Sequence, residues 1–293
     1  MSKTIQQLLQ SNKTIDRLDA ELLIAHTLKK SREFVLSHPK TKVSKIQETK
    51  YKRFVSKRSK GIPFAYLTGN KEFFRLDFFV NKNVLIPRPD TEVLVEEAIK
   101  HINTQTHKPI TLVDVGTGSG CIPISIIKTS KHPNIQTFAT DISRRALRIA
   151  KRNAKKHHVK ASLGSAHVAG KIKFLYGNLL SPILKSSVIS PKSSVIITAN
   201  LPYITKKQFE NEPSIHHEPK LALIAKKQGL ALYEELLEQL ADLQTCRLAC
   251  FFEIDPNQSM EIKTLIKKCL PNAKIEIKPD LAGLDRVVII KNN

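Results

Sequence analysis

The fold is decided by an apolar strand that runs into a glycine-rich turn: Ile110-Thr111-Leu112-Val113-Asp114-Val115-Gly116-Thr117-Gly118-Ser119-Gly120. An apolar helix from Cys121 to Ile127 follows, and a second strand, Gln136 to Thr140, ends in Asp141. Glycines let a backbone approach a ligand closely, and the first N–H groups of the helix face that ligand. An acid after the second strand can accept both hydroxyls of a ribose. These residues predict a site for an adenosine-containing cofactor, with a nicotinamide dinucleotide and S-adenosylmethionine both open.

Strands and helices alternate through the rest of the chain. Further strands are expected at 172–176, 195–197, 248–254, 274–278 and 286–291, and helices at 144–157, 229–243 and 258–270. Residues 161–170 are interpreted as a flexible insertion and 205–220 as a long loop. This alternation predicts an α/β fold with a mostly parallel sheet, covered by helices on both faces and ending in a hairpin.

Polar residues follow the third and fourth strands. Asn178 is expected to hydrogen-bond the amino group or a ring nitrogen of adenine, with Leu179 against the ring. The fourth strand leads into Asn200-Leu201-Pro202-Tyr203, at the sheet edge where ligands bind. An amide oxygen, a backbone carbonyl and an aromatic face suit a planar group that carries an NH2. The stretch predicts methyl transfer to an amide or exocyclic nitrogen; taken alone, it also fits a turn in which Asn caps and Tyr packs.

The N-terminal 60 residues have helical periodicity. Leucine and isoleucine recur at spacings of three to five, and Asp16 is a predicted cap for the second helix. Between Lys40 and Lys60 lie nine Lys or Arg and one acid, Glu48. This segment predicts an amphipathic helix with a basic outer face and an apolar face made by Val43, Ile46, Phe54 and Val55. The basic face suits RNA or an acidic protein, and a merely solvated face is the alternative.

Extended segments and a helix start join this region to the fold above. Residues 72–80 and 84–86, with a turn at Asn81-Lys82-Asn83 between them, predict a β-hairpin. A helix is expected from Glu92 to His101, capped by Thr91 or Asp90. The predicted organisation is therefore a helical bundle at 1–69, a hairpin linker at 70–88 and a catalytic domain at 89–293.

The composition narrows the class of protein. The chain has 48 Lys and Arg against 26 Asp and Glu, a net charge of +22, which suggests a polyanionic partner or simply many solvated lysines. Its four cysteines show no zinc-ligand spacing, and free thiols in a reducing cytoplasm are the simplest interpretation. No membrane span or signal peptide is evident. A soluble, cytoplasmic protein without a metal is expected.

Several motifs together resemble the HemK/PrmC family of methyltransferases that modify glutamine in peptide chain release factors. The similar segments cover about residues 17–291 and are Gly61–Gly69 with Glu72-Phe73, Leu85–Glu92, Asp114–Gly120, Thr140–Ser143, Asn200–Ile204, Glu218-Pro219 with Leu221–Leu223, Glu253-Ile254 with Asn257-Gln258, and Asp280–Gly283 with Asp285–Val288.

The resemblance implies a class I S-adenosylmethionine-dependent methyltransferase, Rossmann-like, with seven strands in its sheet. Its substrate would be the glutamine of a Gly-Gly-Gln motif, and its partner a release factor docked on residues 1–69. Nucleic acid would take part only indirectly, and a monomer is expected. The implied cofactor residues are Gly116, Thr117, Gly118, Ser119, Gly120, Asp141, Asn178, Leu179 and Asn200. Catalysis is assigned to Asn200, Pro202 and Tyr203, and substrate binding to these three with Leu201; no general base is evident.

Four residues depart from the family pattern and keep alternatives open. Leu201 stands where the family usually has Pro, and Asn-Leu-Pro-Tyr is typical of rRNA adenine dimethyltransferases. Asn178 replaces a usual Asp, and Asp255 and Gln228 replace a usual Gly and Asp. The alternatives are an rRNA adenine methyltransferase, the branch of the family that methylates a ribosomal protein, and a non-enzymatic RNA-binding protein.

Overall fold

The structure is a computed structural model. It describes residues 2–105, 109–161, 170–186, 189, 194–243 and 247–292. They form two compact units, the smaller made of 1–70 with 213–217 and the larger of 71–212 with 218–293. Most of the predicted insertion at 161–170 lies outside the described residues. Among the helices that the structure describes, none has the length and apolar composition needed to cross a bilayer.

The smaller unit is a bundle of short helices: α1 (Ile5–Gln10), α2 (Arg17–Leu28), α3 (Arg32–Ser37), α4 (Lys45–Arg58) and α5 (Phe64–Thr68). The predicted cap is confirmed, because the Asp16 carboxylate accepts the backbone N–H of Asp19 at 2.8 Å. The bundle closes over a core that includes Ile5, Leu8, Leu23, Ile24 and Val35. Residues 213–217 belong to the same unit, where a ring nitrogen of His217 lies 2.9 Å from the Lys60 carbonyl oxygen.

The basic helix α4 is confirmed, but its apolar face differs from the prediction. Ile46 is 83% exposed, whereas Tyr51 and the carboxylate of Glu48 are buried. Glu48 is tolerated there because Lys52 pairs with it at 2.7 Å. The inner face is therefore defined by Tyr51, with the half-buried Phe54 and Val55 beside it.

The hairpin is shorter than predicted and, apart from its first residue, belongs to the larger unit. It pairs β1 (Asn70–Phe73) with β2 (Leu76–Phe79), and Phe74 and Arg75 turn the chain at φ of 50° and 59°. Two consecutive left-handed residues make a tight turn whose twist matches that of the strands. Neither of them is a glycine or an asparagine, so the sequence pattern does not predict a turn at this place. The prediction of a strand at 84–86 is wrong, because the Ile86 N–H donates to the Glu218 carboxylate at 2.9 Å instead of to a strand.

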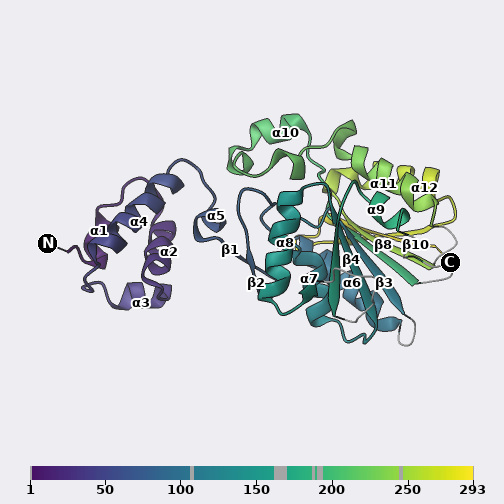
Figure 1. The fold of residues 1–293 in the computed structure, drawn as a ribbon. Coiled ribbons are helices and arrows are strands. Elements are labelled where there is room, and N and C mark those ends of the chain that lie inside the picture. Colours follow the sequence, from purple (N-terminus) through teal and green to yellow (C-terminus); the bar gives the residue numbers. More distant parts are fainter. Residues whose placement is uncertain are drawn as a thin grey trace. The chain divides into compact units, whose positions relative to one another are not determined.

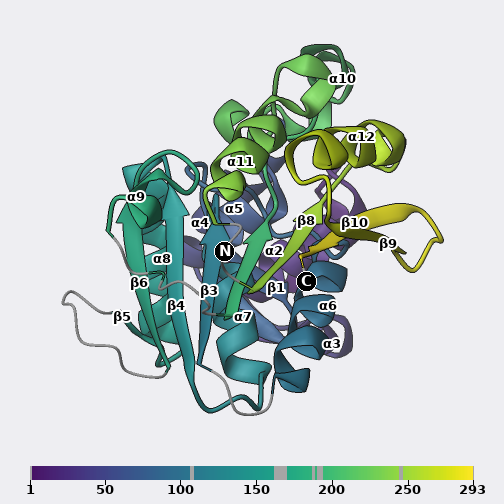
Figure 2. The same ribbon diagram turned by 90° about the vertical axis from the view of Figure 1, so that its right-hand side faces the viewer.

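The larger unit is built on one twisted sheet, with strand order β5-β6-β4-β3-β7-β8-β10-β9 (Figure 2). The strands are β3 (Ile110–Val115), β4 (Ile135–Asp141), β5 (Lys160–Ala161), β6 (Lys171–Tyr176), β7 (Ser194–Ala199), β8 (Arg247–Glu253), β9 (Lys274–Pro279) and β10 (Asp285–Lys291). Only β10 runs opposite to the other strands of this sheet. The predicted seven-stranded, mostly parallel sheet is thus confirmed, and the two-residue strand β5 extends its edge.

Helices cover both faces of this sheet (Figure 1). On one face, α6 (Thr91–Thr104), α7 (Cys121–Thr129) and α8 (Arg144–Lys156) pack in a cluster that contains Leu112 and Ile196. On the other, α9 (Ser181–Leu184), α11 (Ala231–Ala241) and α12 (Ser259–Cys269) pack in a cluster that contains Val113 and Ile197. Neighbouring strand residues enter opposite clusters, which explains why these strands are apolar throughout.

The predicted loop at 205–220 is partly helical. It contains α10 (Lys206–Asn211) and two single turns, Pro213–Ile215 and Lys220–Ala222. Thr205 and Gln208 form a capping box that starts α10. A helix of six residues is too short to show a clear apolar period, which is why the sequence pattern did not reveal it.

Strand register brings the predicted site residues to one edge of the sheet. Val115 at the end of β3 lies beside Thr140 of β4 and Ala199 of β7. The next residues along the three strands are Gly116, Asp141 and Asn200. The glycine turn, the acid and the asparagine therefore meet without any side chain having to reach across the sheet.

Candidate active site

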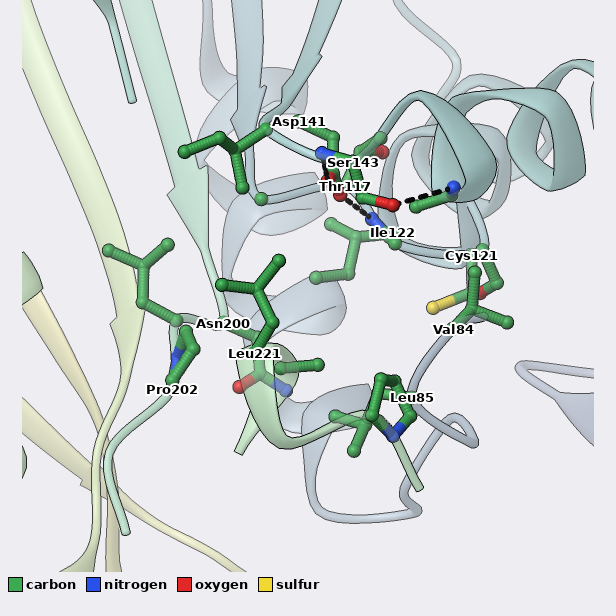
Figure 3. Close-up of a pocket in the computed structure, with 18 of the residues that line it drawn as sticks. Val84, Leu85, Thr117, Cys121, Ile122, Asp141, Ser143, Asn200, Pro202 and Leu221 are labelled. Carbon is green, nitrogen blue, oxygen red and sulfur yellow. Dashed lines mark hydrogen bonds between the residues drawn. The ribbon is translucent and has the colours of Figure 1, made fainter. Parts of the chain in front are cut away.

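A pocket of about 190 Å³ opens at this edge. Ten of the twelve predicted site residues line it: Gly116, Thr117, Gly118, Ser119, Asp141, Asn178, Leu179, Asn200, Leu201 and Pro202. In the close-up, Asp141 and Ser143 lie at one end and Asn200 and Pro202 at the other (Figure 3). Gly120 and Tyr203 are predicted site residues that do not line this pocket.

The glycine turn and Asp141 form one hydrogen-bonded unit. The two carboxylate oxygens of Asp141 accept the N–H groups of Gly118 at 2.8 Å and Ser143 at 2.7 Å. Burial raises the pKa of Asp141, and these two hydrogen bonds oppose the rise. Gly116 and Gly118 have φ of 72° and 54°, and a Cβ at Gly116 would lie 3.0 Å from the Leu201 side chain. The turn thus needs glycine both for its conformation and for the space it leaves.

Gly120 has a packing role instead. It begins α7 at φ of 80°, and a Cβ there would lie 3.2 Å from both the Ala150 and Ile124 side chains. The third glycine of the turn therefore allows α7 and α8 to approach each other. Its expected contact with a cofactor stays a prediction, because a glycine pattern in sequence does not distinguish ligand approach from helix packing.

Asn178 and Leu179 lie on the turn after β6. The Asn178 side-chain NH2 donates to the Glu235 carboxylate of α11. Leu179 is buried and has a left-handed backbone with φ of 45°. Both residues face the pocket, as expected for a surface against which a flat ring can lie.

Asn200 is held in one orientation by two acceptors. Its side-chain NH2 donates to Glu253 Oε2 at 2.9 Å and to Thr91 Oγ1 at 3.0 Å. With both N–H groups used, the amide oxygen of Asn200 is directed elsewhere, and among the described residues none donates to it. Asp90 occupies the N-cap of α6, one of the two predicted positions, but its side chain makes no capping hydrogen bond, and Thr91 is the first residue of the helix. The Thr91 hydroxyl instead serves Asn200, which lies 109 positions away in sequence.

Glu253 is the functional residue that the site prediction missed. It is fully buried at the end of β8, and its second oxygen, Oε1, accepts the Tyr203 hydroxyl at 2.9 Å. Burial raises its pKa, while hydrogen bonds and the charge of Arg286 oppose the rise. The signal was an acid closing the apolar run Leu248 to Phe252, in the strand that neighbours β7. One carboxylate thus connects the Asn and the Tyr of the turn.

The turn itself is anchored from below. The Leu201 N–H donates to the Tyr233 hydroxyl at 3.2 Å, and that hydroxyl donates to the Glu253 carbonyl oxygen. A proline at 201 would have no N–H to give. The departure from the family pattern is therefore matched by a partner in α11, and the Leu201 side chain fills the apolar cluster beneath the turn. Burial raises the pKa of Tyr203 and of Tyr233, so both hydroxyls stay protonated.

Asp114 lies below the glycine turn in β3. It is fully buried and accepts the Thr198 hydroxyl at 2.7 Å. Burial raises the pKa of Asp114 to about 7. Its other oxygen has no hydrogen-bond partner among the described residues. This makes Asp114 an acid whose charge is costly in the folded state.

Two segments form another side of the pocket. Residues 83–88 contribute Asn83, Val84, Leu85, Pro87 and Arg88, and the turn 219–222 contributes Pro219, Leu221 and Ala222. The Glu218 carboxylate joins them, since it accepts both the Ile86 N–H and the Arg88 guanidinium. Leu221 is 63% exposed although it lines the pocket, so an apolar surface is available there.

Possible metal ligands and cysteine thiols among the described residues bear on two further kinds of chemistry. No group of three or more His, Cys, Asp or Glu among these residues could hold an ion. Cys121 lines the pocket, but burial raises its pKa to about 12, so it remains a neutral thiol. Cys121, Cys250 and Cys269 are free, and Cys246 lies outside the described residues.

Known proteins resemble this chain in sequence and in fold. Residues 1–69 match the family model of the PrmC N-terminal domain, and residues 91–195 match that of ribosomal protein L11 methyltransferase. A release factor glutamine methyltransferase of Bacillus anthracis is 31% identical over 93% of this chain and 92% of its own length. One of Enterococcus faecalis is 36% identical over 87% and 84%. The fold is shared with the hMettl16 catalytic domain, with a TM-score of 0.56, 13% identity and 91% of each chain covered.

Proposed function

Because the chain belongs to the family of release factor glutamine methyltransferases, we propose that it transfers a methyl group to the glutamine side chain of a Gly-Gly-Gln motif in a peptide chain release factor. The observation that carries the proposal is the orientation of Asn200. Its NH2 is committed to Glu253 and Thr91, so a hydrogen-bond acceptor is left for an incoming amide.

The pocket residues fit S-adenosylmethionine as the cofactor. The Asp141 carboxylate is aimed by two backbone N–H groups and keeps lone pairs for the two hydroxyls of a ribose. The glycine turn offers close backbone approach, and Asn178 with Leu179 provides a surface for adenine. When bound, S-adenosylmethionine supplies an electrophilic methyl group on a positively charged sulfur.

The chain's own contribution is to position a weak nucleophile. An amide nitrogen is unreactive because its lone pair is delocalised into the carbonyl group. The Asn200 side-chain oxygen and the Leu201 carbonyl oxygen accept the two N–H groups of the glutamine amide and aim its nitrogen. Pro202 stiffens the turn, and the Tyr203 hydroxyl holds Glu253 in place. No base is required before transfer, because the methylated nitrogen becomes acidic and loses its proton to solvent.

Leu201 does not require a different substrate class. The second acceptor is a backbone carbonyl, which any residue supplies, and Tyr233 satisfies the N–H that a proline would lack. Leu201 therefore does not favour rRNA adenine over a protein glutamine as the substrate. The protein substrate extends beyond one glutamine, so the basic residues of the smaller unit are assigned to its docking, with the protein acting as a cytoplasmic monomer.

The proposal is tested by offering labelled S-adenosylmethionine, purified release factor and unmodified ribosomal RNA in one reaction. A release factor whose Gly-Gly-Gln glutamine is replaced by alanine is the matched control. We expect label on the wild-type factor alone. Label on RNA, or label that persists in the control factor, would refute the glutamine assignment.

A further inference from the structure

The adenine end of the pocket is held by two side chains of α11. Glu235 accepts the Asn178 side-chain NH2, and Gln239 accepts the Leu180 backbone N–H at 2.8 Å. Glu235 and Gln239 are four positions apart and so lie on the same face of the helix. Helix α11 thus makes hydrogen bonds to both ends of the segment 178–180, in the turn after β6.

Leu179, between these two bonds, has the conformation that needs such support. Its φ of 45° is left-handed, a conformation that is unfavourable for a residue with a side chain and persists only where the surroundings enforce it. The result is a buried leucine that lines the pocket beside Asn178. Glu235 and Gln239 do not line the pocket themselves, so they act through the residues that they hold.

Glu235 also decides which end of the Asn178 amide is available. A carboxylate has only acceptors, so the NH2 end must turn toward it. The side-chain oxygen of Asn178 is then left for the pocket, and among the described residues none donates to this oxygen. We propose that Glu235 is a positioning residue that fixes Asn178 as a hydrogen-bond acceptor, so that the pocket selects a 6-amino purine over a 6-oxo purine. This inference rests on the proposed function, because it assumes an adenosine cofactor.

The same contact explains why an amide is required at position 178 of this chain. An aspartate there would place a second carboxylate against Glu235. Two carboxylates at hydrogen-bond distance repel each other unless they share a proton. Residues 178 and 235 should therefore behave as a matched pair, in which one member is an amide and the other an acid.

The test measures binding of two ligands to the full chain by calorimetry at pH 8. The ligands are S-adenosylhomocysteine and S-inosylhomocysteine, which carries an oxo group in place of the adenine amino group. Wild type is expected to prefer the adenosyl ligand by about tenfold, the value of one hydrogen bond of the right polarity. Glu235→Ala frees the amide to turn over, so this preference should shrink to within about threefold.

The matched-pair argument gives a rescue experiment. Asn178→Asp should weaken S-adenosylhomocysteine binding by about tenfold, and adding Glu235→Gln should restore it, because the glutamine NH2 donates to the new aspartate. Glu238→Gln, an exposed position on the same helix, is the control and should change nothing. Thermal unfolding of each variant without ligand identifies any that fail to fold.

The outcomes separate this inference from the proposed function. If wild type binds neither ligand, the cofactor assignment fails and the inference fails with it. If wild type binds the adenosyl ligand but Asn178→Asp binds it equally well, Glu235 does not set the polarity of residue 178. An unchanged ligand preference in a folded Glu235→Ala protein would overturn the inference in the same way.

Discussion

Replacing Glu253 with glutamine tests the arrangement around Asn200 most directly. The carboxylate accepts two hydrogen bonds, from the Asn200 NH2 and from the Tyr203 hydroxyl. Glutamine keeps the shape of the side chain but has one acceptor in place of two. Either the glutamine oxygen stays with Asn200, or its NH2 faces Asn200 and the asparagine amide must turn over. In the second case Asn200 presents donors to a substrate that also presents donors.

The expected loss follows from the bonds involved. A hydrogen bond to a charged group contributes about 1.5–3 kcal/mol, and all of it is lost where the Asn200 amide turns over. If the lost orientation is fully felt in the transition state, kcat should fall roughly 10- to 150-fold. Cofactor affinity should stay near wild type, because Glu253 does not line the pocket. Single-turnover methylation of release factor at saturating S-adenosylmethionine measures the first quantity, and calorimetry with S-adenosylhomocysteine measures the second.

A double-mutant cycle separates positioning from general damage. Asn200→Ala alone should raise the barrier by about 2–4 kcal/mol. If Glu253 acts through Asn200, adding Glu253→Gln to that variant should cost less than about 0.5 kcal/mol more. Additive losses would show that Glu253 acts on something other than Asn200. A Glu253→Gln protein with unchanged kcat would refute the reasoning outright.

Three further predictions concern pH, the anchor of the turn and docking. Asp114 has a folded pKa of about 7 against an ordinary value of 3.8, so the folded state holds this proton more tightly than the unfolded state does. The free energy of unfolding should therefore fall as pH rises from 4 to 7. Asp114→Asn should flatten that slope in urea titrations, and an unchanged slope would contradict the assignment. Tyr233→Phe removes the partner of the Leu201 N–H and should cost about 1–3 kcal/mol of stability in the same titrations, whereas combining it with Leu201→Pro, which removes the N–H as well, should cost less than the sum. Arg53→Glu with Lys57→Glu should raise KM for release factor without changing S-adenosylhomocysteine affinity; Lys52 and Arg58 are spared because they pair with Glu48 and Asp19, and an unaltered KM would exclude α4 from docking.

The sheet was predictable because its signals are local. Apolar runs of strand length, each followed by a polar residue or a glycine turn, predicted the strands of this sheet, apart from the two-residue β5, to within two residues at each end. The order of the strands follows from the doubly wound pattern. Ten of the twelve predicted site residues line the pocket for the same reason, because residues at the carboxyl ends of parallel strands must meet at one edge.

The failures concern choices that depend on distant partners. The sequence pattern predicts a strand at 84–86, but the Ile86 N–H donates to the carboxylate of Glu218, 132 positions away. The sequence pattern predicts Thr91 as a helix cap, but its hydroxyl oxygen accepts a hydrogen bond from the Asn200 side chain. In each case the local rule was satisfied by several structures, and a tertiary contact selected one of them.

The same dependence on distant partners governs the chemistry. Sequence shows that an asparagine stands at the end of β7, but an asparagine amide has a donor end and an acceptor end, and only its neighbours decide which one faces the substrate. Glu253 and Thr91 take the donor end of Asn200, and Glu235 takes that of Asn178. Both amides are therefore turned by acids that do not line the pocket. A substrate amide and an adenine amino group each present N–H groups, so a pocket for both must display oxygen. Buried or half-buried carboxylates behind the two asparagines are the simplest way for a chain to guarantee that polarity, since a carboxylate cannot donate.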